Sequence, residues 1–447
     1  MDRLCCGIDI GTTNVKVVLV DGEGRTVFTR ATPTLRLPDG DAVATDAMAL
    51  VRLLETMIVE GWRAAGGGRS LAAISTAGVG EDGFGVTTDI APTGLSLPWF
   101  DGRAEAEAAE LAVAFAGDER AGIAVRPDRT IAKWLWLARH RPAELREARW
   151  WIALTDFPLA CWSGQAFMSL SLAARTACCD VFARQWLDER LAAACAPELP
   201  PLLPAGAVVG GVRAGTLRDS GAADATTLLV AGGHDHPIAS AALKRLDAKA
   251  RVDSLGTANL AYGETQAAIA VQPHGLLAFS PPPKGGAGMA CLGVVEFAAM
   301  LARRGCDEQV LRKALAAMRF PGSPEQDSGS DQSDPMARVR RVAEDAAMTS
   351  RAMFDAMTGI GVPQGPIFMT GGWSRSRALA QLRASVFGVP VQVVGDVELV
   401  ATSAAWIAVE AVAGAPPPAS SDIERATVEP VRDWVPIYER RWQNLPH

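Results

Sequence analysis

The feature that most constrains the fold of this sequence is a short pattern that occurs twice. Asp-Ile-Gly-Thr-Thr fills residues 9–13, and Asp-Ser-Leu-Gly-Thr fills residues 253–257, a little over half the chain later. Each copy lies between two apolar runs that predict β-strands joined by a tight glycine turn. Two domains that open with the same strand–turn–strand unit would produce this echo. A chance match of five residues is the alternative that the sequence leaves open.

Length and composition fit two globular domains. The chain has 447 residues, of which 49% are hydrophobic and 21% charged, as is typical of globular proteins with a large core. The net charge of −7 and the lack of a Lys/Arg run predict no nucleic-acid partner. We find no secretory signal and no membrane-spanning run, so we expect a cytoplasmic protein without a membrane partner. The eight cysteines, four of them in two adjacent pairs, are expected to be reduced thiols.

The order of the expected elements predicts an α/β fold. Strands are expected at residues 5–10, 15–20, 26–31 and 71–76, in the first part of 225–235, at both ends of 251–265, at the start of 365–372 and at 389–394. Helices are expected at residues 46–65, over most of 105–200, and at 237–246, 336–359 and 377–388. Residues 321–335, rich in Pro, Gly, Ser and Asp, predict a loop or hairpin tip.

The first turn, DIGTTNVK, has the residue types of a phosphate site. Gly11 lets the backbone approach a ligand, and consecutive N–H groups in such a turn attract an anion. Thr12, Thr13 and Lys16 could donate to phosphate oxygens, and Asp9 could hold a hydrated Mg²⁺. A plain hairpin is the alternative, but an aspartate within an apolar strand needs a partner. No GxxxxGK[ST] motif occurs, so this turn is not a P-loop.

A second polar segment, GVGEDG at residues 78–83, matches GxGxxG without being followed by a helix pattern. A dinucleotide site is therefore not favoured. The loop presents Glu81 and Asp82, and the PWFDGR segment that follows adds Trp99, Asp101 and Arg103. This combination suits a ligand with many hydroxyl groups. A solvated loop with a core tryptophan is the alternative.

A third segment, AGGHDH, places Asp235 at the start of a predicted helix. The two flanking histidines lack a third metal ligand nearby, and no GxSxG motif supports a nucleophilic triad. A carboxylate at a helix N-terminus stays ionised and is a weak base. A weak base suffices for phosphoryl transfer, where the proton leaves late. MTGGWSRSR at residues 369–377 is a similar strand–glycine turn–helix unit and predicts a nucleotide cradle.

Taken together and in this order, these motifs resemble those of the FGGY carbohydrate kinases of the actin/hexokinase/Hsp70 superfamily. GIDIGTTNVK is similar to the first phosphate motif, DSLGTA to the second, and TGGWSRSRALAQLRASVFGVPV to the adenosine motif. PWFDGR, TIAKWLWLARH, ALTDFPLACWSGQ and SLAARTACCD resemble further family segments, and GGHDH places Asp235 at the position of the catalytic base. The resemblance covers nearly the whole chain.

The resemblance implies an α/β fold of two RNase H-like (actin-like ATPase) domains, residues 1–227 and 228–447, with an interdomain active-site cleft that holds ATP and Mg²⁺. It implies that Asp9 engages Mg²⁺ through water and that Asp235 accepts the proton of a sugar hydroxyl. The implied phosphate and nucleotide contacts are Gly11, Thr12, Thr13, Lys16, Gly256, Thr257, Gly371, Gly372 and Ser374. The implied sugar contacts are Glu81, Asp82, Asp235 and His236.

The predicted function is an ATP-dependent sugar kinase acting on a pentulose or hexulose. Glu81 and Asp82 replace the family's more usual Gln-and-His pattern, so the substrate is not carried over, and Trp373 stands where the family usually has a small residue. Two alternatives stay open: a weakened paralogue that senses sugar or nucleotide, and a superfamily ATPase with a protein partner. The retained Asp9, Asp235 and Thr257 favour the kinase. A homodimer is a family-level expectation.

Overall fold

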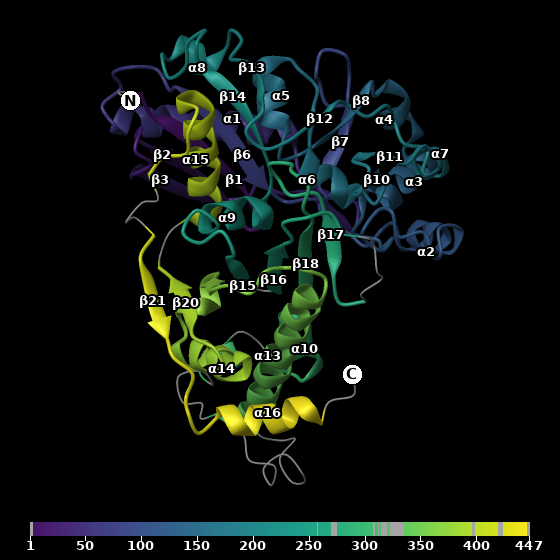
Figure 1. Ribbon diagram of the computed structural model, residues 1–447. Coiled ribbons are helices and arrows are strands. Elements are labelled where there is room, and N and C mark those ends of the chain that lie inside the picture. The colour runs from purple at the N-terminus through teal and green to yellow at the C-terminus, as the bar shows by residue number, and fades with distance from the viewer. Residues whose placement is uncertain are drawn as a thin grey trace. The chain divides into compact units, whose positions relative to one another are not determined.

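The computed structural model of the protein describes residues 3–256, 258–269, 275–306, 309–311, 313, 320–321, 335–395, 398–418 and 423–444 (Figure 1). Contacts divide the chain into two compact units. Unit 1 contains Met1–Arg245, Phe279–Met289 and Glu398–Asp422, and unit 2 contains Leu246–Ala278, Ala290–Val397 and Ile423–His447. The predicted sequence boundary at 227/228 falls inside unit 1, because the strand that follows it pairs within the sheet of that unit. The predicted loop at 321–335 lies almost wholly outside the described residues.

Unit 1 is built around a six-stranded mixed sheet with the order β13-β14-β6-β1-β2-β3. Its strands are β1 (Cys5–Ile10), β2 (Asn14–Val20), β3 (Thr26–Pro33), β6 (Ala73–Gly78), β13 (Val208–Gly211) and β14 (Leu228–His234). β1, β2 and β3 form an antiparallel meander, whereas β1, β6 and β14 run parallel to one another. Every residue of β1 and β6 is buried, which explains their apolar composition.

One face of this sheet is covered by α1 (Ala47–Ala64). Asp46 caps this helix by accepting a hydrogen bond from the backbone N–H of Ala49, which satisfies one of the free donors of the first turn. The apolar face of α1 packs in one core with Ile8 and Ile10 of β1. Because strand side chains alternate, Gly7 and Asp9 lie on the opposite face.

The opposite face is covered by α9 (Asp235–Leu243) and α15 (Leu399–Ala413), which pack against each other (Figure 1). α15 lies along β1 and β6. A Cβ atom on Gly7 would overlap the carbonyl oxygen of Ala401, so the close approach of α15 requires glycine there. A helix from the C-terminal part of the chain thus covers one face of the first sheet.

The rest of unit 1 consists of short helices and two-stranded sheets. The helices are α2 (Glu105–Ala114), α3 (Thr130–His140), α4 (Pro142–Glu147), α5 (Phe157–Ser163), α6 (Leu170–Ala173), η1 (Ala174–Thr176), α7 (Asp188–Ala193) and α8 (Thr216–Asp219). The strand pairs are β4 (Leu37–Asp39) with β5 (Ala42–Ala44), β7 (Gly83–Val86) with β8 (Trp150–Ala153), β9 (Met168–Ser169) with β12 (Leu202–Leu203), and β10 (Cys179–Asp180) with β11 (Gln185–Trp186). The sequence predicted helices for residues 105–200 and missed the strands among them, which are two to four residues long.

Unit 2 is built around a seven-stranded mixed sheet with the order β17-β18-β16-β15-β19-β20-β21. Its strands are β15 (Arg251–Leu255), β16 (Asn259–Glu264), β17 (Ala278–Ser280, of which only Ala278 is assigned to unit 2), β18 (Ala290–Val295), β19 (Ile367–Thr370), β20 (Val391–Val394) and β21 (Arg425–Val428). Its helices are α10 (Phe297–Arg303), α13 (Pro335–Gly359), η2 (Gly372–Arg375), α14 (Arg377–Phe387) and α16 (Val435–Gln443). α13 packs on β16 and β18, with α14 beside it and α16 on α14.

The two sheets share one topology. In unit 1, β3-β2-β1 is an antiparallel meander followed by the parallel strands β6 and β14, and β13 pairs antiparallel with β14. In unit 2, β18-β16-β15 is the corresponding meander, β19 and β20 are parallel to β15, and β21 pairs antiparallel with β20. The prediction of two α/β domains is therefore confirmed, and their sheets share the same strand order and directions.

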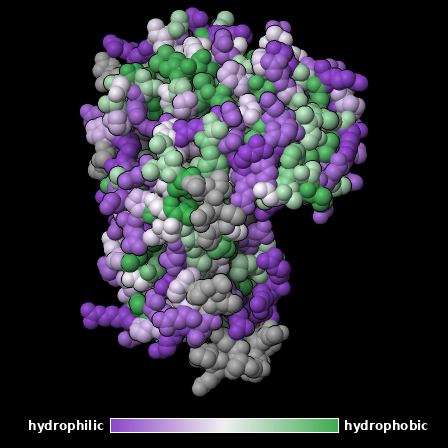
Figure 2. All heavy atoms as spheres, turned by 45° about the vertical axis from the view of Figure 1, so that its right-hand side comes forward, coloured by the Kyte–Doolittle hydropathy of each residue, from purple (hydrophilic) through white to green (hydrophobic). Residues whose placement is uncertain are grey.

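Hydropathy and the cysteines complete the description of the fold. Within the described ranges, no helix is long and apolar enough to cross a bilayer. On the face drawn in Figure 2, hydrophobic side chains are interspersed with hydrophilic ones. The eight cysteines all lie within the described residues and form no disulfide bond, and burial raises the pKa of several of them, including Cys5 and Cys291, to about 12.

Candidate active site

The polar residues predicted in unit 1 meet at one edge of its sheet. β14, β6 and β1 are adjacent and parallel, so their carboxyl ends lie side by side. β1 ends at the turn of residues 11–13, β6 ends at the loop that holds Glu81, and β14 ends at Asp235. Ligands of open α/β sheets bind at such edges. The topology therefore brings three of the predicted motifs together.

Asp9 lies just before this edge and has charged neighbours. Its Oδ2 is 3.4 Å from Nζ of Lys16, the residue directly opposite on β2, and the same Nζ is 2.7 Å from Oε2 of Glu398. Burial raises the pKa of Asp9 to about 7, Lys16 opposes the rise, and the carboxylates of Asp235 and Glu398 add to it. Asp9 and Asp235 are thus close enough to repel each other, a repulsion that a bound cation would relieve.

The turn after β1 is held by its own backbone. The N–H of Gly11 donates to the carbonyl of Asn14 at 3.0 Å, and the hydroxyl of Thr34 donates to the carbonyl of Gly11 at 2.7 Å. The indole N–H of Trp99 donates to the hydroxyl oxygen of Thr12 at 2.9 Å, while Thr13 is exposed. The two hydroxyl groups remain at the edge, whereas Lys16 is already paired with carboxylates.

Asp235 is the first residue of α9, and its contacts fall on one carboxylate oxygen. Oδ1 accepts the backbone N–H of His236 at 2.7 Å and lies 3.2 Å from Nε2 of His234 and 3.7 Å from Nε2 of His236. The side chain of Asp235 is 24% exposed and that of His236 is 30% exposed, so both can meet a ligand. Burial lowers the pKa of His234 to about 3, with Arg175 and Arg129 adding to the shift against the pull of Asp235.

Glu81 lies in a buried cluster that the motif analysis did not include. Its Oε1 accepts hydrogen bonds from Arg175, at 2.8 Å from Nε, and from Arg129. Burial alone would raise the pKa of Glu81, but Arg175 and Arg129 hold it below its usual range. Glu81 is therefore an ionised carboxylate with a fixed orientation. A search for charged residues inside apolar runs would have found Arg175, within SLAARTACC, but not Arg129, which precedes TIAKWLW.

Asp82 supports the loop from the other side. It is fully buried and accepts the backbone N–H of Trp99 at 2.7 Å. Burial raises its pKa, against the charges of Lys133 and Arg36. The ammonium group of Lys133 donates to the carbonyls of Glu81, Leu97 and Pro98 at 3.0–3.1 Å. Lys133 thus ties the 78–83 loop to the PWFDGR segment.

The predicted nucleotide residues lie on two neighbouring turns of unit 2. β15 and β19 are parallel neighbours, and the turn at Gly256 follows the first while Gly371 follows the second. The N–H of Gly256 donates to the carbonyl of Ala258 at 3.1 Å. The hydroxyl of Ser374 donates to the carbonyl of Gly371 at 2.8 Å, while Gly372 is exposed. Thr257 lies outside the described residues.

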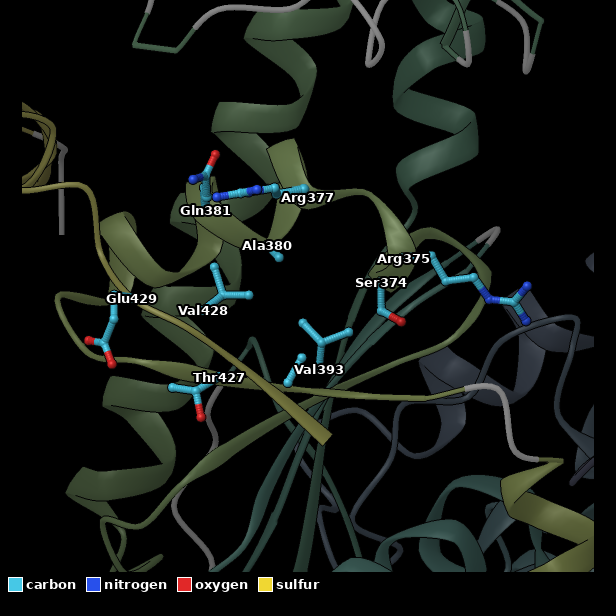
Figure 3. A pocket seen from close by; sticks show the side chains of 10 residues that line it. Ser374, Arg375, Arg377, Ala380, Gln381, Val393, Thr427, Val428 and Glu429 are labelled. Atoms are coloured by element: carbon cyan, nitrogen blue, oxygen red, sulfur yellow. The ribbon is translucent and has the colours of Figure 1, made fainter. Parts of the chain in front are cut away.

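A cavity of about 520 Å³ opens beside this second turn (Figure 3). Ser374, Arg377 and Gln381 line it from the turn and α14, and Val393 and Thr427 line it from the strands. Arg375 extends away from the other labelled side chains in Figure 3. Trp373 lines a separate, smaller space with Leu255, Asn259 and Arg383. Trp373 therefore does not fill the larger cavity.

Among the described residues, His, Cys, Asp and Glu side chains form no group of three or more that would hold a metal by themselves. The chemistry at Asp9 still fits a magnesium ion that arrives with ATP. Mg²⁺ keeps several waters and takes one or two protein carboxylates plus phosphate oxygens. Asp9 offers a buried carboxylate whose charge interacts with that of Asp235. Lys16 neutralises the Asp9 charge only in part, because the same ammonium group also pairs with Glu398.

Comparisons with known proteins cover both halves of the chain. Residues 4–242 match the family model for the N-terminal domain of the FGGY family of carbohydrate kinases, and residues 296–412 match that for its C-terminal domain. A xylulose kinase of Streptomyces coelicolor is 28% identical over 437 residues, which are 90% of this chain and 86% of that enzyme. A xylulose kinase of Escherichia coli is 27% identical over 278 residues, 58% of this chain and about half (54%) of that enzyme.

The fold is also found in a solved structure. A gluconate kinase from Lactobacillus acidophilus superposes with a TM-score of 0.84 over 99% of this chain and 96% of that chain, at 16% sequence identity. The same architecture therefore occurs in proteins named for different sugars. The fold therefore does not select the substrate.

Proposed function

Because the chain belongs to the FGGY family of carbohydrate kinases, we propose that it transfers the γ-phosphate of ATP to a hydroxyl group of a ketose, either a pentulose or a hexulose. Kinases of this family use ATP. A pentulose is the first substrate to test, since both curated relatives described above are xylulose kinases.

The observation that carries the proposal is that Asp235 and Asp9 lie at the same carboxyl edge, on parallel strands separated by β6, and are close enough for their charges to interact. In the proposed reaction, Asp235 accepts the proton of the attacking sugar hydroxyl while the phosphoryl group moves from ATP to the oxygen. A carboxylate suffices as base because the hydroxyl proton leaves late in a loose transition state. Asp9 would hold the hydrated Mg²⁺, which neutralises phosphate charge when it is bound.

The remaining predicted residues divide between sugar and nucleotide. Glu81 and His236 are assigned to sugar hydroxyl groups, because Arg175 and Arg129 fix the carboxylate of Glu81 and His236 is partly exposed. Asp82, already bonded to the backbone of Trp99, supports the same loop.

We assign the phosphates of ATP to Gly11, Thr12, Thr13, Gly256 and Thr257. We assign the rest of the nucleotide to Gly371, Gly372 and Ser374. The cavity beside Ser374 has the size of a small-molecule site. Lys16 pairs with Asp9 and Glu398. We assign it two roles: it orients the Asp9 carboxylate that would hold Mg²⁺, and it binds a phosphate oxygen. A homodimer stays a prediction.

The test is a coupled ADP-release assay with Mg-ATP and a panel of ketoses, aldoses and polyols, with the product identified by mass. We expect release that depends on a ketose. Asp235→Asn should lower kcat by about 1,000-fold or more, the scale of general-base catalysis, while ATP binding measured by calorimetry changes little.

Asp188→Asn is the matched control, because Asp188 is also the first residue of a helix, α7, and is exposed. It should keep native activity. Ketose-dependent release that survives in Asp235→Asn would remove Asp235 as the base. A sugar that raises the melting temperature without ADP release would favour a sensor, and ADP release that no sugar stimulates would favour an ATPase with a protein partner.

A further inference from the structure

Trp99 is an aromatic residue that lies open to solvent beside two of the predicted site segments. It is 39% exposed, although large aromatic side chains are mostly buried. It belongs to the PWFDGR segment, and it contacts both the 78–83 loop and the turn of residues 11–13. No step of the proposed reaction uses its indole ring. Its contacts nevertheless indicate a function at the 11–13 turn.

The backbone of Trp99 is anchored to the 78–83 loop. Its N–H donates to Oδ1 of Asp82 at 2.7 Å. The ammonium group of Lys133 donates to the carbonyl of Pro98, the preceding residue, at 3.0 Å and to the carbonyl of Glu81 at 3.1 Å. Asp82 and Lys133 are both buried, so water does not compete for these bonds. Trp99 is therefore held in a fixed position relative to the loop that we assign to the sugar.

The indole N–H of Trp99 extends to the 11–13 turn. It donates to Oγ1 of Thr12 at 2.9 Å. Among the described residues, this is the one hydrogen bond that the Thr12 hydroxyl makes. The ring of Phe100 packs edge to face on the indole, with centroids 5.8 Å apart and planes at 85°. Trp99 therefore connects the 78–83 loop to the 11–13 turn through two hydrogen bonds, one from its backbone and one from its ring.

The direction of this hydrogen bond decides where the Thr12 proton can go. A hydroxyl group has one proton to donate and two lone pairs that accept, whereas an indole N–H can only donate. The Thr12 oxygen must therefore accept from Trp99, and its own proton is left for another acceptor. Accepting a hydrogen bond also polarises the O–H group and makes it a better donor. The oxygens of a phosphoryl group accept hydrogen bonds, so they complement a hydroxyl that is held in this way.

We propose that Trp99 is a positioning residue, whose indole N–H holds the hydroxyl of Thr12 so that the hydroxyl proton is donated to the transferred phosphoryl group. This inference rests on the proposed function, which assigns Thr12 to the phosphates of ATP. A donor that is oriented before the reaction stabilises the charge on the moving group without a reorganisation cost. The gain therefore appears in kcat and not in KM for the ketose.

The first experiment is a double-mutant cycle of Trp99→Phe and Thr12→Val. Phenylalanine keeps an aromatic ring without the N–H, and valine keeps the shape of threonine without the hydroxyl. We expect Thr12→Val to lower kcat about 10- to 100-fold, as for the loss of a hydrogen bond to a charged group. Trp99→Phe should lower kcat about 5- to 10-fold, with KM for the ketose within about twofold. The double variant should match Thr12→Val within about twofold, because the indole then has no hydroxyl to orient.

Trp150→Phe is the matched control, because Trp150 is also partly exposed and its indole makes no hydrogen bond to a described residue. It should behave as the native enzyme. Thr12→Ser keeps the hydroxyl and should recover kcat to within about threefold of the native value. A native kcat in Trp99→Phe, with Asp235→Asn inactive, would overturn the positioning role and leave the base assignment intact. Losses that multiply in the double variant would show that Trp99 acts independently of Thr12 and would also overturn it. An active Asp235→Asn would instead overturn the proposed function.

A second measurement detects the hydrogen bond without turnover. ¹⁵N-labelled tryptophan gives twelve indole N–H signals in the native protein, of which the Trp99 signal is the one missing in Trp99→Phe. We expect Thr12→Val to move the Trp99 signal and to leave the Trp150 signal in place. A Trp99 signal that does not respond to Thr12→Val contradicts the proposal.

A third measurement probes the phosphoryl position by calorimetry. ADP with Mg²⁺ and aluminium fluoride imitates the transferred phosphoryl group, whereas ADP with Mg²⁺ alone leaves that position empty. In the presence of the ketose, Trp99→Phe should weaken binding of the first probe about 5- to 10-fold and of the second less than about twofold. Equal weakening of both probes would contradict a role at the transferred group.

Discussion

Asp9 in unit 1 and Asp253 in unit 2 open the two copies of the repeated pattern, but they lie on opposite faces of equivalent strands. Asp9 precedes its glycine by two residues and Asp253 precedes its glycine by three. Because side chains alternate along a strand, this one-residue offset reverses the face. Asp9 points to the α15 side near Asp235, whereas Asp253 points to α14, where its Oδ2 is 3.4 Å from Nε of Arg383.

The difference separates an aspartate available for chemistry from one used for structure. Asp253 is fully buried with Arg383 as its charged partner, and that arginine also donates to the carbonyl of Ala346 at 2.9 Å. The pair ties β15 to α14 and α13 beneath the second turn. Burial raises the pKa of both aspartates, but the cation that pairs with Asp9 among the described residues, Lys16, is shared with Glu398. A duplicated pattern in the sequence therefore does not imply a duplicated role.

The largest effect should come from Asp9→Asn. Removing the negative charge that would hold the hydrated Mg²⁺ should lower kcat by about 1,000-fold, because a metal contributes several kcal/mol to charge stabilisation in phosphoryl transfer. The assay is ADP release against Mg²⁺ concentration at saturating ketose. An unchanged Mg²⁺ response would remove Asp9 from the site and make the two aspartates equivalent.

The same variant should be more stable than the native protein at high pH. The pKa of Asp9 is about 7 in the fold and 3.8 without it, so the folded state holds an extra proton between these values and loses stability as pH rises from about 4 to 7. Asn has no such dependence. Without ligands, we expect Asp9→Asn to exceed the native free energy of unfolding by on the order of 3 kcal/mol at pH 8, and by little at pH 4.

Asp253→Ala should do the reverse, lowering stability while sparing chemistry. Arg383 would be left buried without its charged partner, at a cost of about 3 to 4 kcal/mol. Denaturant titration measures this loss, and kcat of the folded fraction should change less than about threefold. Adding Arg383→Met should restore part of the stability, because the unpaired charge is then removed. A stable but inactive Asp253→Ala would place this aspartate in the site instead.

Gly7→Ala should lower stability by a smaller amount, and it tests a feature of β1 in unit 1 that β15 in unit 2 lacks. Gly7 faces α15 without room for a Cβ atom, whereas the equivalent position of β15 is Val252. We expect Gly7→Ala to destabilise the protein by about 2 kcal/mol, as overpacking does. Gly68→Ala is the control, because a Cβ atom there would meet nothing within 4 Å. Equal melting temperatures for the two variants would contradict the close approach of α15.

The local elements were predictable because local patterns decide them. The strands at 5–10 and 251–255, the helix from 47 and the helix from 377 follow from apolar runs, glycine turns and periodicity. Contacts between distant segments were not predictable. No local pattern predicts that α15 covers the sheet of unit 1. Nor does any local pattern predict that Arg129 and Arg175 both donate to Glu81. The one-residue offset of Asp253 was visible in the sequence. Its consequence was not, because the sequence does not show which face of β1 packs against α15 or which face of β15 packs against α14.

The position of α15 sets the order in which the protein can mature during synthesis. Residues 1–245 leave the ribosome first and contain every strand of the first sheet, yet the helix that covers Gly7 and Asp9 comes from residues 399–413. The nascent N-terminal half therefore waits with an apolar face uncovered until residues 399–413 have been translated. Exposed faces of this kind are what chaperones bind and what drives aggregation of incomplete chains. A truncated N-terminal half is thus an unfinished core and not an independent domain.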